Sequence, residues 1–124
     1  MRRARIVGMG AYAPKRILTN DDLEKMVATS DEWIVQRSGI RERRIADESE
    51  ATSDLAVKAA QQALERASLV PEDIDFIAVG TTTPDMFFPS VGNIVQHRLG
   101  CGRAGAVDLL AACAGSVYSL SMGS

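Results

Sequence analysis

A stripe of small apolar side chains between Ser53 and Ala67 is the clearest hydrophobic pattern in this sequence of 124 residues. Its apolar positions recur at steps of three and four residues, which predicts an amphipathic helix with one face toward a core. Because most of the stripe is alanine, we expect this helix to pack closely against a flat sheet or another helix, and Pro71 marks the end of the segment. The stripe consists of Leu55, Ala56, Ala59, Ala60, Ala63, Leu64 and Ala67.

Four shorter helices are predicted mainly from the residues at their boundaries. Ser30 and Ser90 are favourable N-cap residues. Gly39 and Gly100 supply the left-handed backbone on which helices commonly end. The predicted helices cover residues 19–27, with Thr19 or Asn20 as the cap, then 30–39, 90–100 and 114–122.

Apolar runs between these helices predict strands. Residues 74–83 are almost continuously apolar, as expected for a strand that is covered on both faces, and residues 104–110 predict a second such strand. Residues 3–14 are expected to contain a first strand closed by glycines, and residues 40–46 a further one. The alternation of strands and helices predicts an α/β fold with a mostly parallel sheet covered by helices.

Composition and charge narrow the class of protein. The net charge of −2 gives no electrostatic reason to expect a nucleic acid or an anionic membrane as a partner. Two cysteines are too few for a disulfide framework and favour a reducing compartment. No run approaches the roughly 20 apolar residues that span a bilayer. We therefore expect a cytoplasmic protein with no membrane and no nucleic-acid partner.

A glycine pattern near the N-terminus resembles a dinucleotide-binding fingerprint. Gly8, Gly10 and Ala13 have the spacing G-x-G-x-x-A, which requires a helix that opens toward a phosphate. Pro14 follows at once, and no helical signal begins before residue 19. We therefore interpret the glycines as the end of a strand.

Cys113 lies where a predicted strand gives way to a predicted helix, among alanines and Gly115. A thiol at such a corner lies near the positive end of the helix and near unpaired backbone N–H groups, which favour the thiolate and can hold an oxyanion. Small neighbours would let the chain turn sharply and let an acyl group approach the sulfur. A cysteine among alanines is also an ordinary small core residue, and spacing alone leaves both interpretations open.

The second cysteine lacks this setting. Cys101 lies between two glycines after a predicted helix, and we expect it to be unreactive. Together with His97 and Cys113 it supplies only three candidate metal ligands at no familiar spacing, so no metal site is expected.

Three ordered blocks resemble β-ketoacyl-acyl-carrier-protein synthase III, a condensing enzyme that initiates bacterial fatty acid synthesis. They are "TNDDLEKMVATSDEWIVQRSGIRERRIA", "AVGTTTPDMFFPS" and "DLLAACAGSVYSLS". The resemblance implies a thiolase-like fold built from two related α/β halves, and a homodimer in the full-length protein. Residues 1–124 would then be a partial N-terminal thiolase-like domain without its C-terminal half.

The resemblance also implies the chemistry. Cys113 would be the nucleophile that takes an acyl group from acyl-coenzyme A and condenses it with malonyl-acyl-carrier protein as carbon dioxide leaves. No cofactor would be tightly bound, since the coenzyme A thioester is a substrate. Such enzymes complete the condensation with a histidine and an asparagine from the C-terminal half. None of His97, Asn20 and Asn93 lies in a matching motif, so this chain alone is expected not to condense.

By the same resemblance, Thr29 and Trp33 would contact the adenine of coenzyme A and Arg37 its phosphates. Thr82 and Phe88 would lie at the acyl pocket, with Phe88 also near the dimer contact. The ordinary alternatives are a packing anchor for Trp33, a solvated charge for Arg37 and a core position for Phe88. Two other functions also stay open: a starter synthase of a polyketide-type pathway, and a non-enzymatic fragment that acts through a dimer or partner surface.

Overall fold

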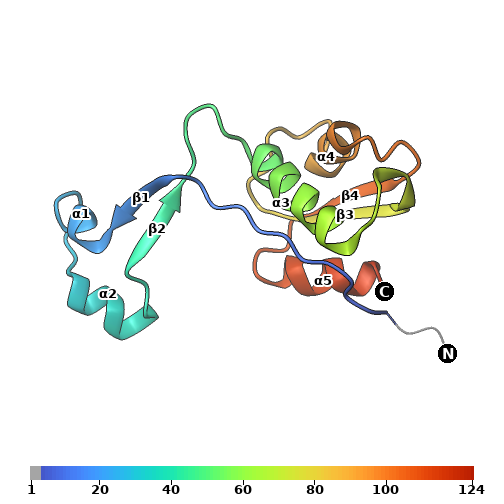
Figure 1. Cartoon of the computed structure of the whole chain (residues 1–124). Coiled ribbons are helices and arrows are strands. Elements are labelled where there is room, and N and C mark those ends of the chain that lie inside the picture. The colour runs from blue at the N-terminus through green and yellow to red at the C-terminus, as the bar shows by residue number, and fades with distance from the viewer. Residues whose placement is uncertain (1–3) are drawn as a thin grey trace. The chain divides into compact units, whose positions relative to one another are not determined.

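A computed structural model describes residues 4–124, which form two compact units (Figure 1). The smaller unit comprises residues 13–50. The larger unit joins residues 4–12 to residues 51–124. Each unit has its own small sheet, so each is described by itself.

The smaller unit pairs two short strands with two short helices. Strand β1 (Arg16–Thr19) is antiparallel to β2 (Glu42–Ile45), in the register that sets Arg16 opposite Ile45. Helix α1 (Asn20–Glu24) begins at Thr19, whose Oγ1 accepts from the backbone N–H of Asp22. Helix α2 (Asp31–Ser38) follows. The two helices and β2 confirm the sequence predictions, whereas β1 was not predicted.

A buried amide lies at the centre of the smaller unit. The Asn20 side chain is 1% exposed, and its Nδ2 donates to Asp31 Oδ1 at 2.7 Å and to the carbonyl of Ile40 at 2.8 Å. Its Oδ1 accepts from Arg43 Nη1 at 2.6 Å. One side chain therefore ties the first turn of α2, the loop after α2 and β2 to the start of α1.

The larger unit is built on two parallel strands. β3 (Phe76–Gly80) pairs with β4 (Gly105–Leu109), with Gly80 opposite Leu109 at their carboxyl ends. Helix α4 (Val91–Leu99) lies on one face of this pair and α5 (Ala114–Met122) on the other (Figure 1). Helix α3 (Thr52–Ala67) packs beside α4, and a short 3-10 turn, Pro71–Asp73, precedes β3.

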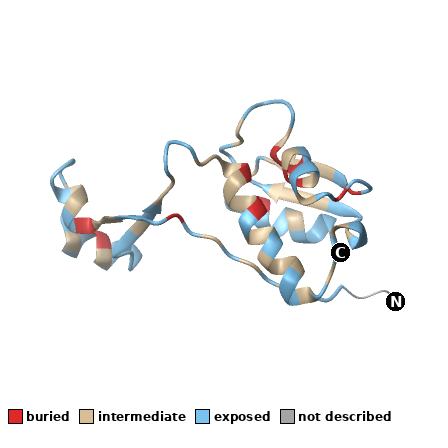
Figure 2. Cartoon of the chain, turned by 45° about the horizontal axis from the view of Figure 1, so that its top comes forward, coloured by how far each residue is buried: buried red, intermediate tan, exposed pale blue. Residues whose placement is uncertain are grey.

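A small apolar core lies between α3, α4 and the strands. Val57, Val91 and Val95 are buried at its centre (Figure 2). Partly buried residues pack against them: Ala56, Ile77, Val79 and Leu99. The predicted elements α3, α4, α5, β3 and β4 are all confirmed, and so is the α/β class with a parallel sheet.

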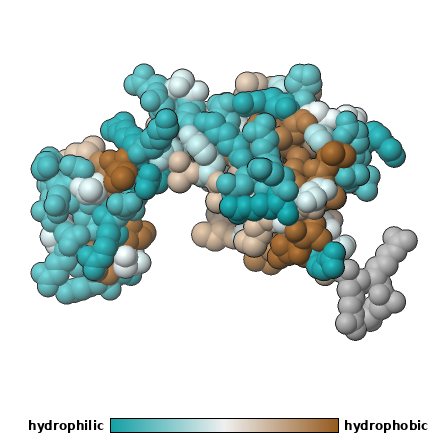
Figure 3. Space-filling model, in the orientation of Figure 1, coloured by the Kyte–Doolittle hydropathy of each residue, from teal (hydrophilic) through white to brown (hydrophobic). Residues whose placement is uncertain are grey.

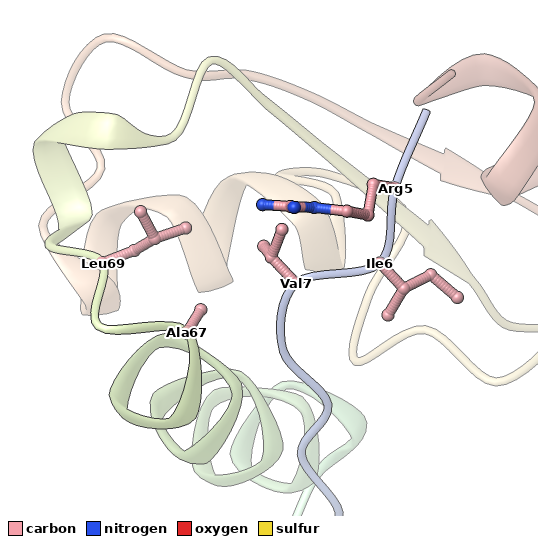
Figure 4. Close-up of a pocket in the computed structure, with 5 residues that line it drawn as sticks. All are labelled: Arg5, Ile6, Val7, Ala67 and Leu69. Carbon is pink, nitrogen blue, oxygen red and sulfur yellow. The ribbon is translucent and has the colours of Figure 1, made fainter. Parts of the chain in front are cut away.

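The predicted first strand is wrong for the described part of residues 3–14, because none of residues 4–14 belongs to a strand. The segment instead lies along α3, where Gln62 accepts from the Ala11 N–H at 2.9 Å and Arg66 donates to the Met9 carbonyl at 3.0 Å. A strand needs a neighbouring strand as its hydrogen-bond partner, and here side chains of α3 take that place. Figure 4 shows the segment passing Ala67 and Leu69.

The glycines of this segment have a packing role. A Cβ added at Gly8 or Gly10 would collide with the backbone of α3 at Ala63 or Ala59. They therefore allow close approach to a helix, and the described segment opens no helix toward a phosphate.

Large apolar side chains remain at the surface of the larger unit (Figure 3). On α5, Val117 is 63% exposed and Leu120 is 66% exposed. Among the described residues, no helix has both the length and the apolar character needed to cross a membrane.

Candidate active site

The corner between β4 and α5 presents Cys113 to solvent. β4 ends at Leu109, α5 begins at Ala114, and Cys113 is the N-cap residue of α5. Ala112 just before it has φ +46°, in the left-handed region, which makes the turn tight. The Cys113 side chain is exposed and makes no capping hydrogen bond within the described chain. The geometry of the predicted strand–helix corner is confirmed.

Backbone hydrogen bonds change one detail of the expected corner. The N–H groups of Ala114 and Gly115 donate back to the carbonyls of Ala111 and Ala112, each at 3.0 Å. These two donors are therefore paired rather than free, because the tight turn brings the preceding carbonyls within reach. The N–H of Cys113 itself has no acceptor among residues 4–124, so it is a free donor on the same residue as the sulfur.

Close backbone packing explains why one neighbour of Cys113 is small. A Cβ on Gly115 would lie 3.2 Å from the Leu109 carbonyl oxygen and 3.4 Å from Gly80 Cα. A Cβ on Gly80 would in turn lie 3.0 Å from the Gly115 carbonyl carbon. The first turn of α5 thus packs directly against the carboxyl ends of β3 and β4. This contact fixes the position of the Cys113 corner relative to the sheet.

Cys101 has the opposite environment. Its side chain is fully buried, and burial, followed by the negative charge of Glu72, raises the pKa of its thiol. It lines an apolar cavity of about 190 Å³, together with residues of α3, β3 and α4. This burial supports the expectation that Cys101 is unreactive.

The predicted coenzyme A residues share one exposed face of the smaller unit. Thr29 and Trp33 line an open hollow of about 290 Å³, together with Ala28 and Ser30. Arg37 lies one turn further along α2, with its guanidinium carbon 5.1 Å from the centre of the Trp33 ring. Trp33 is 55% exposed, so it is not the buried packing anchor of the alternative interpretation.

Thr82 and Phe88 lie in the loop of residues 81–90 and are both exposed. Phe88 is 89% exposed and its neighbour Phe87 is 99% exposed, so the core alternative is wrong for this chain. The start of α3 holds the loop, because Thr52 Oγ1 donates to the Thr83 carbonyl at 2.5 Å.

Asp108 was missed at the sequence level. It lies in β4, and both of its carboxylate oxygens accept backbone N–H groups from α4. The available signal was a lone charge within the apolar run of residues 104–110. Within residues 4–124 no three histidine, cysteine, aspartate or glutamate side chains are grouped so as to hold a metal ion.

Comparison with known proteins gives this corner its context. No family model matches the chain. A β-ketoacyl-[acyl-carrier-protein] synthase III from Caldanaerobacter subterraneus subsp. tengcongensis is 59% identical over 119 residues, which are 96% of this chain and 36% of the relative. The crystal structure of 3-oxoacyl-[acyl-carrier-protein] synthase III from Aquifex aeolicus VF5 superposes with a TM-score of 0.91 at 49% identity, covering 95% of this chain and 38% of the other.

The chain is a relative of β-ketoacyl-[acyl-carrier-protein] synthase III. Its fold is correspondingly thiolase-like, as the resemblance implied. The chain spans little more than a third of the length of the synthase III relatives that it matches. The priming β-ketosynthase of the R1128 polyketide pathway is also similar, with a TM-score of 0.91 at 39% identity, over 95% of this chain and 35% of that one.

Proposed function

We propose that this chain is the part of a β-ketoacyl-acyl-carrier-protein synthase III in which an acyl group is transferred from acyl-coenzyme A to Cys113. The observation that carries the proposal is the exposed Cys113 at the tight corner before α5. The similarity to synthase III over nearly the whole chain supports it.

The acylation step uses groups that this corner supplies. Cys113 Sγ, as the thiolate, attacks the carbonyl carbon of the thioester, and a carbon–sulfur bond forms. The carbonyl oxygen becomes negatively charged, and the free N–H of Cys113 is a donor for it. The intermediate collapses as the bond to coenzyme A breaks, and the leaving thiolate takes up the proton that Cys113 released. The product is an acyl-enzyme thioester and free coenzyme A.

Coenzyme A recognition is assigned to the exposed face of α2. The adenine would stack on Trp33 beside Thr29, in the open hollow that these two residues line. Arg37 is exposed next to the Trp33 ring, and its positively charged guanidinium would bind a phosphate of coenzyme A. No tightly bound cofactor is part of the proposal.

Condensation with malonyl-acyl-carrier protein would follow on the acyl-enzyme. Loss of carbon dioxide from the malonyl group leaves an enolate carbon, which attacks the acyl carbon and releases Cys113. Residues outside this chain would supply the histidine and asparagine for this step, in a cytoplasmic homodimer. Thr82 and Phe88 would line the acyl pocket of the complete enzyme.

A polyketide starter synthase is the second candidate function. The observation that favours it is the equally close superposition on a priming β-ketosynthase. It would acylate Cys113 in the same way, but the acyl group would then pass from Cys113 to a different acceptor. The exposed apolar side chains of α5 would suit the third interpretation, a fragment that acts only through a partner surface.

Mass spectrometry of the full protein after incubation with acetyl-coenzyme A tests the proposal. We expect a mass increase of one acetyl group, which Cys113→Ala abolishes. Cys101→Ala is the matched control, because it removes the other thiol, which is buried, and should leave the label in place. Labelling that persists in Cys113→Ala would overturn the assignment.

A further inference from the structure

The carboxylate of Asp108 satisfies two of the first N–H groups of α4 at once. Its Oδ2 accepts from the Val91 N–H and its Oδ1 from the Gly92 N–H, both at 2.7 Å. Ser90 Oγ accepts the third, from Asn93, at 3.2 Å. The first three N–H donors of α4 are therefore all paired. Two of them bond the carboxylate of Asp108, which lies in β4 and follows Val91 by 17 residues and Gly92 by 16.

Gly92 makes this contact sterically possible. A Cβ at this position would lie 3.1 Å from the Val107 N, 3.2 Å from the Val107 carbonyl oxygen and 3.3 Å from Asp108 Oδ1. The backbone of α4 therefore lies against the backbone of β4 at the level of Asp108. We call the pair of hydrogen bonds from Val91 and Gly92 to Asp108 the Asp108 clamp.

The clamp lies between two segments that the proposed reaction uses. Toward the C-terminus, β4 ends one residue after Asp108, and the Cys113 corner follows. Toward α4, the clamp holds the end of the loop that carries Thr82 and Phe88. The start of the same loop is bonded to the other side of the corner, because the Thr81 N–H donates to the Leu109 carbonyl at 3.3 Å.

We propose that Asp108 is a positioning residue that holds the Cys113 corner and the end of the 81–90 loop in one fixed arrangement. The inference rests on the proposed function for its chemical consequence, although its structural part does not. Asp108 acts through the backbone of Val91 and Gly92 and does not touch the substrate. Loss of the clamp should misplace the sulfur relative to the bound thioester while leaving the thiol exposed.

The test compares Asp108→Asn with Asp54→Asn in the full protein. Asparagine keeps the size of the side chain but offers one acceptor where the clamp needs two. Asp54 also ties α4 to a neighbour, since its Oδ1 accepts from Arg98 Nη1 at 2.7 Å, but near the far end of α4. Each variant thus removes one carboxylate that bonds α4, at its N-terminus in Asp108→Asn and near its C-terminus in Asp54→Asn. Asp54 differs in that its Oδ2 also accepts from the Ala51 N–H at the start of α3.

Two rates are measured for Cys113 in each variant: acylation by saturating acetyl-coenzyme A and alkylation by iodoacetamide. A misplacement of about 1 Å can slow a reaction by as much as about a hundredfold, so we expect acylation in Asp108→Asn to fall by about tenfold to a hundredfold. Alkylation should change less than about threefold, because iodoacetamide reacts with an exposed thiolate and does not have to bind in a fixed orientation. Asp54→Asn should change neither rate by more than about threefold. Equal loss of acylation in both variants would overturn the proposal.

Hydrogen exchange gives a readout that does not depend on the acylation chemistry. In Asp108→Asn, the amides of residues 109–115 should exchange faster than in the unchanged protein, whereas in Asp54→Asn they should not. Unchanged exchange over 109–115 in Asp108→Asn would refute the positioning role. If the unchanged protein is not acylated at Cys113, the proposed function fails, and the exchange result alone decides the role of Asp108.

A second variant covers the case in which Asp108→Asn does not fold. Gly92→Ala weakens the same clamp from the side of α4, because the new methyl group must displace the backbone at Val107. We expect the same pattern of faster exchange and slower acylation, with a smaller effect. Absence of both changes in folded Gly92→Ala would count against the proposal.

Discussion

Cys101 and Cys113 show how strongly the local fold determines what one side chain can do. Cys113 is exposed at the N-terminus of α5, whereas Cys101 is buried with its thiol pKa raised by desolvation. The small residues around Cys113 indicated a special position in the sequence. The pairing of the Ala114 and Gly115 N–H groups was not predictable, because it depends on the left-handed backbone of Ala112.

Native alkylation should separate the two thiols. At pH 8, iodoacetamide should modify Cys113 roughly tenfold faster than Cys101 or more, because only Cys113 is accessible and burial keeps Cys101 protonated. Peptide mass spectrometry over a time course gives both rates. In urea the two rates should converge, and equal rates in the folded protein would contradict an exposed nucleophile.

At the scale of elements, the helices were predictable because their signals are local. Ser30 and Ser90 cap α2 and α4 through their own side chains, and Gly39 and Gly100 end these helices with positive φ. β1 was missed because its partner, β2, follows only after two intervening helices. The first predicted strand failed because apolar pattern alone does not reveal whether a ladder partner exists. Asp108 and Asn20 act through such distant contacts, so sequence spacing gave no account of them.

Removing the buried amide should loosen the smaller unit selectively. Asn20→Ala leaves Asp31, Arg43 and the Ile40 carbonyl without their partner, and we expect a loss of about 2–3 kcal/mol in the unfolding free energy of this unit. The protein's single tryptophan, Trp33, lies in this unit, so urea titration of its fluorescence reports the change. Asn93→Ala, in the larger unit, should leave the Trp33 midpoint unchanged, and equal shifts in both variants would contradict a selective role for Asn20.

The junction of α3 and α4 should weaken in acid. The Ala51 N–H, followed by the Arg98 guanidinium, lowers the pKa of Asp54 below its usual value. A carboxyl whose pKa is lower in the folded chain stabilises the fold above its unfolded pKa, and this contribution is lost as pH falls through the folded pKa. Circular dichroism during urea unfolding should therefore show a smaller loss of stability below pH 4 in Asp54→Asn than in the unchanged protein. Parallel pH profiles would contradict this role of Asp54.

At the scale of the whole molecule, the two units divide the proposed work. The larger unit holds the Cys113 corner and the smaller one the exposed Trp33 face. The thiolase-like fold and the family resemblance were predictable, because three blocks of sequence matched in order. The arrangement of residues that completes a condensing site was not predictable, because this chain spans only about a third of the length of its synthase III relatives.

The 124-residue chain by itself should release no carbon dioxide from malonyl-acyl-carrier protein. Asn20 is buried with its amide fully bonded, and the Asn93 Oδ1 accepts from Ser90 at 2.5 Å. The single histidine, His97, lies in the last turn of α4. A radiolabelled carbon dioxide assay on the purified chain, with a complete synthase III as the positive control, measures this. Release above the level of Cys113→Ala would show that the chain condenses unaided.

The contact between Gly80 and Gly115 has a consequence for how this corner can vary. Backbone touches backbone there, so volume, more than polarity, decides which residues either position admits. In a library of variants randomised at residue 115, the variants that still fold should carry the smallest side chains, whether these are polar or apolar. The freedom to vary the residues around Cys113 then lies on the outward side of the turn, where side chains meet solvent.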